Sequence, residues 1–265
     1  MRLKDKVILV TASTRGIGFA IVKTCAKEGA HVYMAARNLD IAKEKADKLI
    51  SQGYTVKYVY NDAGKPESYV SMVEEVIKSA GRIDVLVNNF GTSNPGKDLD
   101  FRNTDTEVFL DTVNMNLRSV FMGSKEVVKY MSKQGGGSII NISSVGGLVP
   151  DISQVAYGTS KAAINYLTKL IAVHEAKNNI RCNAVLPGMT ATDAVEKNLT
   201  EEFRELFLRH IPLNRMGTPE EIAEAVVYFA SDESAYTTGQ ILTVSGGFGL
   251  ATPVYGDLSN KKIRR

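Results

Sequence analysis

The chain has 265 residues, of which 44% are hydrophobic and 23% charged, with a formal net charge of +3. This composition is ordinary for a globular protein and excludes a strongly basic nucleic-acid binder. No apolar run is long enough to span a bilayer, and the start of the chain does not read as a signal peptide. Cys25 and Cys182 require no disulfide framework. We therefore expect a cytoplasmic protein with no membrane or nucleic-acid partner.

Short β-branched runs alternate with amphipathic stretches along the whole chain. Strands are expected at 7–11, 31–36, 55–60, 85–88, 138–142, 180–186 and 241–244, and helices at 18–27, 39–52, 67–80, 105–132, 157–177, 201–209 and 219–230. Such alternation predicts right-handed βαβ units. The fold class is thus α/β: a single Rossmann-like, doubly wound domain over residues 1–265, with a mostly parallel seven-stranded sheet, helices on both faces, and a C-terminal extension at 251–265.

A glycine-rich turn follows the first predicted strand and opens the first helix. In a doubly wound fold this turn presents backbone N–H groups to a pyrophosphate, although a tight strand-to-helix turn alone would look the same. The candidate cofactor-binding residues here are Ser13, Thr14, Arg15, Gly16, Ile17 and Gly18.

The end of the second predicted strand indicates which dinucleotide would bind. An NAD-binding chain would have a carboxylate there for the adenosine ribose, whereas this chain has Ala36 followed by Arg37. Arg15 and Arg37 would converge on a ribose 2′-phosphate, which suits guanidinium groups by charge and fork geometry. The expected cofactor is therefore NADP.

Tyr157 and Lys161 lie four positions apart in a predicted helix and so share one face of it. A free phenol has a pKa of about 10 and is a poor base at neutral pH. A cation about 4 Å away is worth roughly 4 kcal/mol at an effective dielectric constant of 20, enough to lower that pKa strongly. The pair is a candidate acid/base centre, whereas an isolated pair of this kind would be an ordinary helical contact.

Together these motifs resemble the classical short-chain dehydrogenases/reductases over nearly the whole chain. The matching blocks are residues 11–18, 88–91, Asn116, Ser144, Tyr157 with Lys161, Pro187-Gly188 and Gly246-Gly247. The resemblance implies that Tyr157 is the general acid/base, Ser144 orients the substrate oxygen, Lys161 binds the nicotinamide ribose and lowers the tyrosine pKa, and Asn116 holds a water of the proton relay. It further implies cofactor contacts from Asp62, Ala63, Asn89, Gly91, Tyr157, Lys161, Gly188, Thr190 and Thr192.

Three positions depart from the family pattern. Ala12 stands where glycine is usual, so we expect its backbone to avoid positive φ, where a Cβ is penalised. Phe90 replaces an alanine and would crowd or line the active site. Ser245 stands where an acid is common. None of the three removes a catalytic group.

Loop residues around the expected pocket carry a more specific resemblance, to the NADP-dependent 7α-hydroxysteroid dehydrogenases of intestinal anaerobic bacteria. They are residues 89–95, 149–154 and 247–253. The resemblance implies reversible oxidation of the 7α-hydroxyl of a bile acid, a small-molecule steroid, to a 7-oxo group, with Ser144, Val145 and Tyr157 at the substrate. General sequence similarity within a family that acts on many different substrates would also explain these loop residues.

Apolar side chains would wall this pocket, which suits a rigid, apolar alcohol. They are Val145, Leu148, Val149, Ile152, Met189, Val195, Leu199, Phe203, Leu206 and Phe207. For Phe203, Leu206 and Phe207, helix packing is the favoured interpretation. Residues 251–265 would either close over the pocket or fray.

Two other functions remain open. A 3-oxoacyl thioester reductase of fatty-acid synthesis would share the fold, cofactor and catalytic residues, and a non-catalytic nucleotide-sensing protein would share the fold alone. No His, Cys, Asp or Glu spacing suggests a metal site. The long helices at 105–132 and 157–177 resemble the family's subunit interface, which implies a homotetramer.

Overall fold

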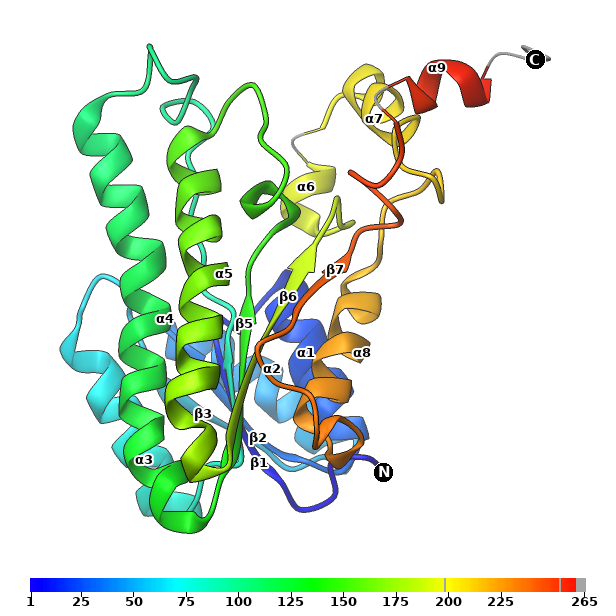
Figure 1. The fold of residues 1–265 in the computed structure, drawn as a ribbon. Coiled ribbons are helices and arrows are strands. Elements are labelled where there is room, and N and C mark those ends of the chain that lie inside the picture. The colour runs from blue at the N-terminus through cyan, green and yellow to red at the C-terminus, as the bar shows by residue number, and fades with distance from the viewer. Residues whose placement is uncertain (198, 253, 261–265) are drawn as a thin grey trace.

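One seven-stranded sheet organises the part of the chain that the computed structural model describes, residues 1–197, 199–252 and 254–260 (Figure 1). The strands are β1 (Val7–Thr11), β2 (His31–Ala36), β3 (Val56–Tyr60), β4 (Val85–Asn88), β5 (Gly137–Ile142), β6 (Ile180–Pro187) and β7 (Ile241–Val244). Their order is β3-β2-β1-β4-β5-β6-β7, and every neighbouring pair is parallel. The expected fold class is confirmed, and the sheet is wholly rather than mostly parallel.

Helices cover both faces of the sheet (Figure 1). One layer holds α1 (Gly16–Lys27), α2 (Leu39–Ile50) and α8 (Pro219–Ala230), and the other holds α3 (Glu67–Ala80), α4 (Thr106–Gln134) and α5 (Val155–Glu175). The shorter helices are η1 (Val145–Gly147), η2 (Ala176–Asn178), α6 (Asp193–Glu196), α7 (Glu201–Leu208), η3 (Asp232–Ser234) and α9 (Tyr255–Asn260). The seven strands and helices α1–α5, α7 and α8 lie within a few residues of the sequence-based expectation. The short helices α6, α9, η1, η2 and η3 were not expected.

The central strands are apolar throughout because both of their faces are buried. All five residues of β1 are buried, and they alternate between the two layers. Ile8 and Val10 belong to the core under α1 and α8, whereas Val7 and Leu9 belong to the core under α3 and the C-terminal half of α4. Because both faces of the central strands are buried, the sheet holds the loops at its carboxyl edge in place.

The glycine turn corrects one sequence-based expectation, because Ala12 does adopt a positive φ, of 50°. The left-handed conformation directs its carbonyl oxygen to Asn89 Nδ2, which donates to it over 3.0 Å. Gly18 lies against the same atoms: a Cβ there would sit 2.5 Å from both the Ala12 oxygen and Asn89 Nδ2. The cross-turn hydrogen bond therefore offsets a left-handed penalty of about 1–2 kcal/mol for a residue with a Cβ.

The carboxyl ends of all seven strands meet at one edge of the sheet, since the strands are parallel. The loops that carry the sequence motifs follow these ends, and the order of strands reverses between β1 and β4. In open α/β sheets ligands bind at such a reversal. Within the described part of the chain, no helix is both long and apolar enough to cross a membrane.

Candidate active site

The four candidate catalytic residues come from three elements at this edge. Ser144 follows β5, Asn116 lies near the middle of α4, and Tyr157 and Lys161 occupy the first two turns of α5. Helix α5 packs along α4, and its start faces η1, which begins directly after Ser144 (Figure 1). The fold thus brings together residues that are up to 45 positions apart.

The Tyr157 phenol is enclosed at the start of α5. Burial raises its pKa, and a hydrogen bond with the Ser144 hydroxyl lowers it by a smaller amount. Ser144 also accepts a hydrogen bond from the Gly146 N–H over 3.1 Å, which fixes its side chain. The protein alone therefore keeps the phenol protonated at neutral pH.

Lys161 is 3% exposed, and its Nζ donates to the Ile142 carbonyl oxygen over 3.0 Å. Burial lowers the pKa of this ammonium to about 8. Its Nζ lies 5.5 Å from the centroid of the Tyr157 ring, on the shared helical face that the spacing predicted. In the protein alone, burial and not the cation sets the direction of the Tyr157 pKa, which differs from the sequence-based expectation.

Asn116 connects both long helices to a loop. Its Oδ1 accepts from the Thr92 N–H over 2.8 Å, and its Nδ2 donates to the Thr92 carbonyl and to Ser160 Oγ over 3.0 and 2.9 Å. Ser160 in turn donates to the Tyr157 carbonyl over 2.7 Å. Both amide hydrogens are therefore already paired, so the side chain braces the site.

After the glycine turn, the first backbone N–H groups of helix α1 have no side-chain cap among the described residues. Helix α1 begins after Arg15 with no side-chain cap, so within the described residues the N–H groups of its first turn have no side-chain acceptor. A hollow of about 190 Å³ lies beside them, bordered by Thr14, Arg15, Gly16 and, from the opposite side, Thr192. Free N–H groups at a helix start fit a pyrophosphate. Ile17 is half-buried, whereas Ser13 is fully buried and donates to the Ala35 carbonyl beneath the turn.

Arg15 and Arg37 are both exposed, and neither forms an ion pair with another described residue. They follow β1 and β2, which are adjacent strands. The guanidinium groups of Arg15 and Arg37 are thus free to bind an anion.

The two candidate residues after β3 are held by local hydrogen bonds. The Asp62 carboxylate accepts from the Gly64 N–H over 3.0 Å, and the Ala63 carbonyl accepts from Arg118 Nη2 over 3.1 Å.

The remaining candidate residues pack closely around the same edge. Asn89 donates to the Ala12 carbonyl, and a Cβ on Gly91 would lie 3.0 Å from Lys161 Nζ. A Cβ on Gly188 would lie 2.8 Å from Ser245. The hydroxyl of the buried Thr190 donates to the Gly188 carbonyl, and Thr192 caps α6 by accepting from the Val195 N–H. Glycine is required where the backbone approaches this closely.

Apolar side chains of α7 stack on the segment that follows β7. Phe203 stacks on Phe207 with ring centroids 6.1 Å apart, and Phe207 stacks on Phe248 at 5.0 Å. Phe203 and Leu206 are each 47% exposed, and α7 has no fully buried residue. Phe203 and Phe207 therefore pack on each other along α7, and part of the apolar surface of this helix stays exposed.

The rim continues down to the catalytic serine. A Cβ on Gly249 would lie 2.8 Å from Val149 Cγ2, so the segment after β7 touches the loop that begins with Ser144 and the half-buried Val145. We call α6, α7, α9 and residues 245–250 the substrate rim. At its outer side α9 lies on the end of α7 (Figure 1), where Asp257 and Arg209 form an ion pair at 3.9 Å. The extension was expected at 251–265, of which residues 253 and 261–265 lie outside the described residues.

Sequence reasoning missed two residues of the site. Ser160 stands inside the Tyr157 motif and would have been found from its spacing, because it lies three positions from Tyr157 on the same helix. Phe248 lies within residues 247–253, which the resemblance placed around the pocket, but its stacking on Phe207 was not foreseen. Asp98 has no sequence signal at all, since its hydrogen-bond partners are 58 and 59 positions away. Among the described residues, no three His, Cys, Asp or Glu side chains could share a metal ion.

Comparisons with known proteins agree with this geometry. A family model described as Enoyl-(Acyl carrier protein) reductase matches residues 11–249. A 7alpha-hydroxysteroid dehydrogenase of Clostridium sardiniense is 52% identical over 97% of this chain and 98% of its own length, and one of Paraclostridium sordellii is 49% identical over 99% and 98%. A 3-oxoacyl-[acyl-carrier-protein] reductase of Thermotoga maritima is 41% identical over 93% and 99%.

The fold comparison gives the same result. The crystal structure of gox2181 superposes with a TM-score of 0.88 at 30% identity, covering 93% of this chain and 96% of that one. The chain belongs to the short-chain dehydrogenase/reductase family. It is accordingly an oxidoreductase that interconverts an alcohol and a carbonyl with a nicotinamide cofactor.

Proposed function

We propose that this chain is an NADP-dependent 7α-hydroxysteroid dehydrogenase, which reversibly oxidises the 7α-hydroxyl of a bile acid to a 7-oxo group. The observation that carries the proposal is the apolar substrate rim, which runs from Phe203 through Phe207 and Phe248 to Val149 beside the serine loop. A rigid steroid presents an apolar face of matching chemistry, and its burial is favourable by about 25 cal/mol per Å². The 7alpha-hydroxysteroid dehydrogenase relatives support the same substrate class.

Tyr157 acts as the general acid and base in this proposal. Its raised pKa keeps the phenol protonated, so in the reductive direction it donates its proton to the carbonyl oxygen. Ser144 holds that oxygen by a hydrogen bond. In the oxidative direction Tyr157 first releases its own proton, and the phenolate then takes the hydroxyl proton. Asn116 braces the first turn of α5 through Ser160, and Lys161 is held by the Ile142 carbonyl on the same helical face as Tyr157. The nicotinamide, when bound, supplies the hydride acceptor or donor.

NADP is favoured over NAD by the residues that follow β1 and β2. Arg15 and Arg37 are exposed cations without ion-pair partners among the described residues, and Ala36 offers no carboxylate to a ribose diol. A ribose 2′-phosphate would accept charge-assisted hydrogen bonds from both guanidinium groups. The residues of the turn therefore fit the phosphorylated dinucleotide.

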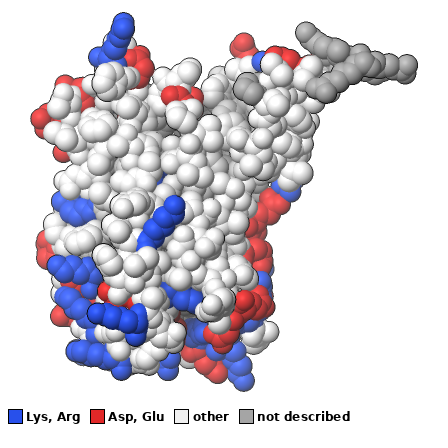
Figure 2. All heavy atoms as spheres, in the orientation of Figure 1, with Lys and Arg blue, Asp and Glu red and all other residues white. Residues whose placement is uncertain are grey.

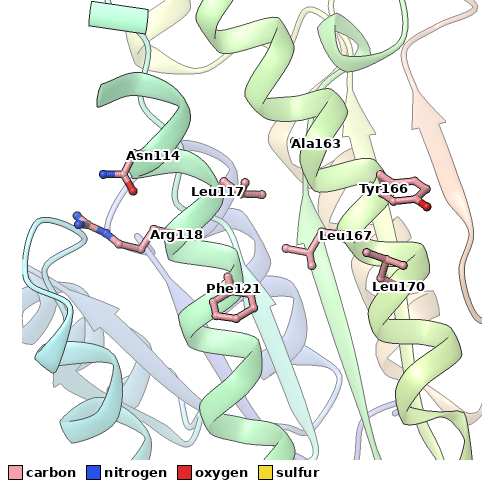
Figure 3. Close-up of a pocket in the computed structure, with 8 residues that line it drawn as sticks. All are labelled: Asn114, Leu117, Arg118, Phe121, Ala163, Tyr166, Leu167 and Leu170. Atoms are coloured by element: carbon pink, nitrogen blue, oxygen red, sulfur yellow. The ribbon is translucent and has the colours of Figure 1, made fainter. Parts of the chain in front are cut away.

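A homotetramer is proposed from the outer face of α4 and α5. A hollow of about 420 Å³ lies between these helices. Figure 3 shows the residues that line it, most of them apolar: Asn114, Leu117, Arg118, Phe121, Ala163, Tyr166, Leu167 and Leu170. Phe121 is 51% exposed and Tyr166 66%. In Figure 2 the charged side chains gather mainly at the lower end and edges of this face. Apolar patches of this kind mark subunit interfaces, and light scattering tests the assembly.

Reduction of a 3-oxoacyl thioester is the second candidate, favoured by the Thermotoga maritima relative. A carrier-bound phosphopantetheine would need a basic surface beside the pocket. At α7 the basic side chains are partly neutralised, since Arg204 pairs with Glu201 at 3.7 Å and Arg209 with Asp257 at 3.9 Å. This charge balance favours the steroid.

A bile acid with hydroxyls at 3α, 7α and 12α tests the proposal in one reaction. The purified protein is incubated with NADP⁺ and this substrate, and the product is located by mass spectrometry and carbon NMR. We expect loss of two hydrogens with a new carbonyl at C7. Oxidation at C3 or C12, or turnover only of an acetoacetyl thioester with NADPH, would refute the 7α assignment.

A further inference from the structure

Helix α5, which carries Tyr157 and Lys161, begins without a cap of its own. Its N-cap residue, Gln154, has a left-handed backbone with φ of 61° and makes no side-chain capping bond. The first intrahelical bond within this turn runs from the Gly158 N–H to the Gln154 carbonyl. The N–H groups of residues 154–157 therefore need acceptors from elsewhere in the chain.

One short segment of a distant loop supplies all four acceptors. The Asp98 carbonyl accepts from Gln154 over 3.1 Å, and the Leu99 carbonyl accepts from Val155 over 3.3 Å. The two carboxylate oxygens of Asp98 accept from Ala156 and from Tyr157, each over 2.9 Å. The catalytic tyrosine is thus bonded through its own backbone to Asp98.

The Asp98 side chain is dedicated to this contact. The residue is 0% exposed, and among the described residues no Lys, Arg or His forms an ion pair with it. A buried carboxylate without a cation is costly unless hydrogen bonds and a favourable dipole compensate. Two charge-assisted bonds and the positive end of a 21-residue helix provide both here.

The same loop is fixed to the other catalytic helix. Thr92 exchanges two hydrogen bonds with Asn116 of α4, and Ser93 donates to the Gln154 side chain over 2.7 Å. Residues 92–99 therefore join Asn116 to the start of α5. Displacing Asp98 would shift Tyr157 relative to Ser144 and to the loop.

We propose that Asp98 is a positioning residue for the general acid/base: its buried carboxylate sets the height and rotation of the first turn of α5 and so aims the Tyr157 phenol. The inference rests on the proposed role of Tyr157, and it applies to any carbonyl substrate. It predicts that Asp98 acts on the chemical step and not on cofactor affinity.

Asp105 offers a matched control. Its carboxylate also accepts two first-turn N–H groups, from Glu107 over 2.9 Å and Val108 over 3.3 Å, at the start of α4. It is exposed and lies eleven positions before Asn116. Asp98→Asn and Asp105→Asn make the same chemical change from carboxylate to amide. Asp105 accepts both N–H groups with Oδ1 alone, which asparagine keeps, whereas Asp98 uses one oxygen for each N–H group and loses one of them.

The experiment compares wild type, Asp98→Asn and Asp105→Asn. The measurements are kcat, the Kd for NADPH from its fluorescence, and the kinetic isotope effect with NADPH deuterated at the transferred position of C4. For Asp98→Asn we expect kcat to fall at least tenfold, a larger isotope effect on kcat, and a Kd within threefold of wild type. For Asp105→Asn we expect kcat within twofold and an unchanged isotope effect.

A kcat for Asp98→Asn within threefold of wild type with an unchanged isotope effect would overturn the proposal. If Asp98→Asn fails to fold, Asp98→Glu keeps both oxygens but displaces them by one methylene, and a tenfold loss of kcat with NADPH binding retained supports the proposal. Wild-type kcat in Asp98→Glu, or loss of NADPH binding in both variants, overturns it. If the wild-type protein is inactive on bile acids, only the proposed function is refuted. The same variants are then compared with the acetoacetyl thioester as substrate.

Discussion

The catalytic residues and the substrate rim are built in opposite ways. Asn116, Ser144, Tyr157 and Lys161 are held by hydrogen bonds to strands and helices whose faces are buried, and Asn116 and Lys161 are almost inaccessible. The rim has stacked rings, partly exposed apolar side chains and a helix with no buried residue. We infer that, under the proposed function, the buried part determines the chemistry and the rim determines which molecule reaches it.

The largest effect is expected from the rigid part, in Tyr157→Phe. This change removes the transferable proton and leaves the ring, so kcat falls by about a hundredfold to ten-thousandfold while NADPH affinity is retained. Steady-state rates and NADPH fluorescence measure the two quantities. Tyr236→Phe, at a fully exposed ring away from these residues, is the control and should keep its kcat. A near-normal kcat in Tyr157→Phe would remove Tyr157 from the mechanism.

The cofactor turn should show the next largest effect. In Arg15→Ala combined with Arg37→Ala, two charge-assisted contacts of about 1.5–3 kcal/mol each are lost toward a phosphate that NAD⁺ lacks. We expect the KM for NADP⁺ to rise at least about a hundredfold. The KM for NAD⁺, measured in the same preparation, serves as the control and should change little. Parallel changes for both cofactors would place the 2′-phosphate elsewhere.

Burial of the catalytic ammonium should appear as pH-dependent stability. Lys161 has a pKa of about 8 in the folded protein, and its unfolded value is near 10.5. Between these values the unfolded chain binds more protons, so this group makes the protein more stable as pH rises from 8 to 10.5, by on the order of 3 kcal/mol. Urea unfolding of the cofactor-free protein measures the slope. In Lys161→Met the extra rise should vanish, and equal slopes would contradict the assignment.

The rim should give a smaller and more selective effect. Phe207→Ala removes the middle ring of the stack, and we expect the KM for a 7α-hydroxy bile acid to rise roughly tenfold, equivalent to about 1.4 kcal/mol. Because the catalytic residues are untouched, kcat should stay within about threefold of wild type. Tyr236→Ala, at a fully exposed ring away from the rim, is the control. A large loss of kcat with an unchanged KM would mean that α7 supports the chemistry.

The sequence predicted the regular part of the molecule well for a physical reason. Strands buried on both faces read as continuous apolar runs, and the Tyr157–Lys161 spacing follows from helix geometry alone. The mostly parallel sheet follows from the same pattern, and the structure makes it wholly parallel. Ser144 and Asn116 were assigned by resemblance to the family and not by periodicity. The positions of strands and helices depend on local periodicity, so they can be predicted from the sequence alone.

The missed features depend on contacts between distant segments. The positive φ of Ala12 is set by Asn89, which is 77 positions away, and the acceptors for the start of α5 come from Asp98. Phe203 and Leu206 are spaced like core residues, yet each is 47% exposed, and Phe248, the ring that extends the stack, lies 41 positions after Phe207. The residue types at these positions do not indicate which distant residues they contact.

The ratio of kcat/KM for a 7α-hydroxy bile acid to that for its 7β epimer tests the central claim most directly. Both molecules present the same apolar body to the rim, and they differ only in whether the hydroxyl can reach Ser144 and Tyr157. With NADP⁺ as the oxidant we expect the 7α epimer to be favoured at least about a hundredfold, which corresponds to roughly 2.7 kcal/mol. Equal values for the two epimers, or turnover of neither, would contradict a rim that selects the steroid and catalytic residues that read its 7α-hydroxyl.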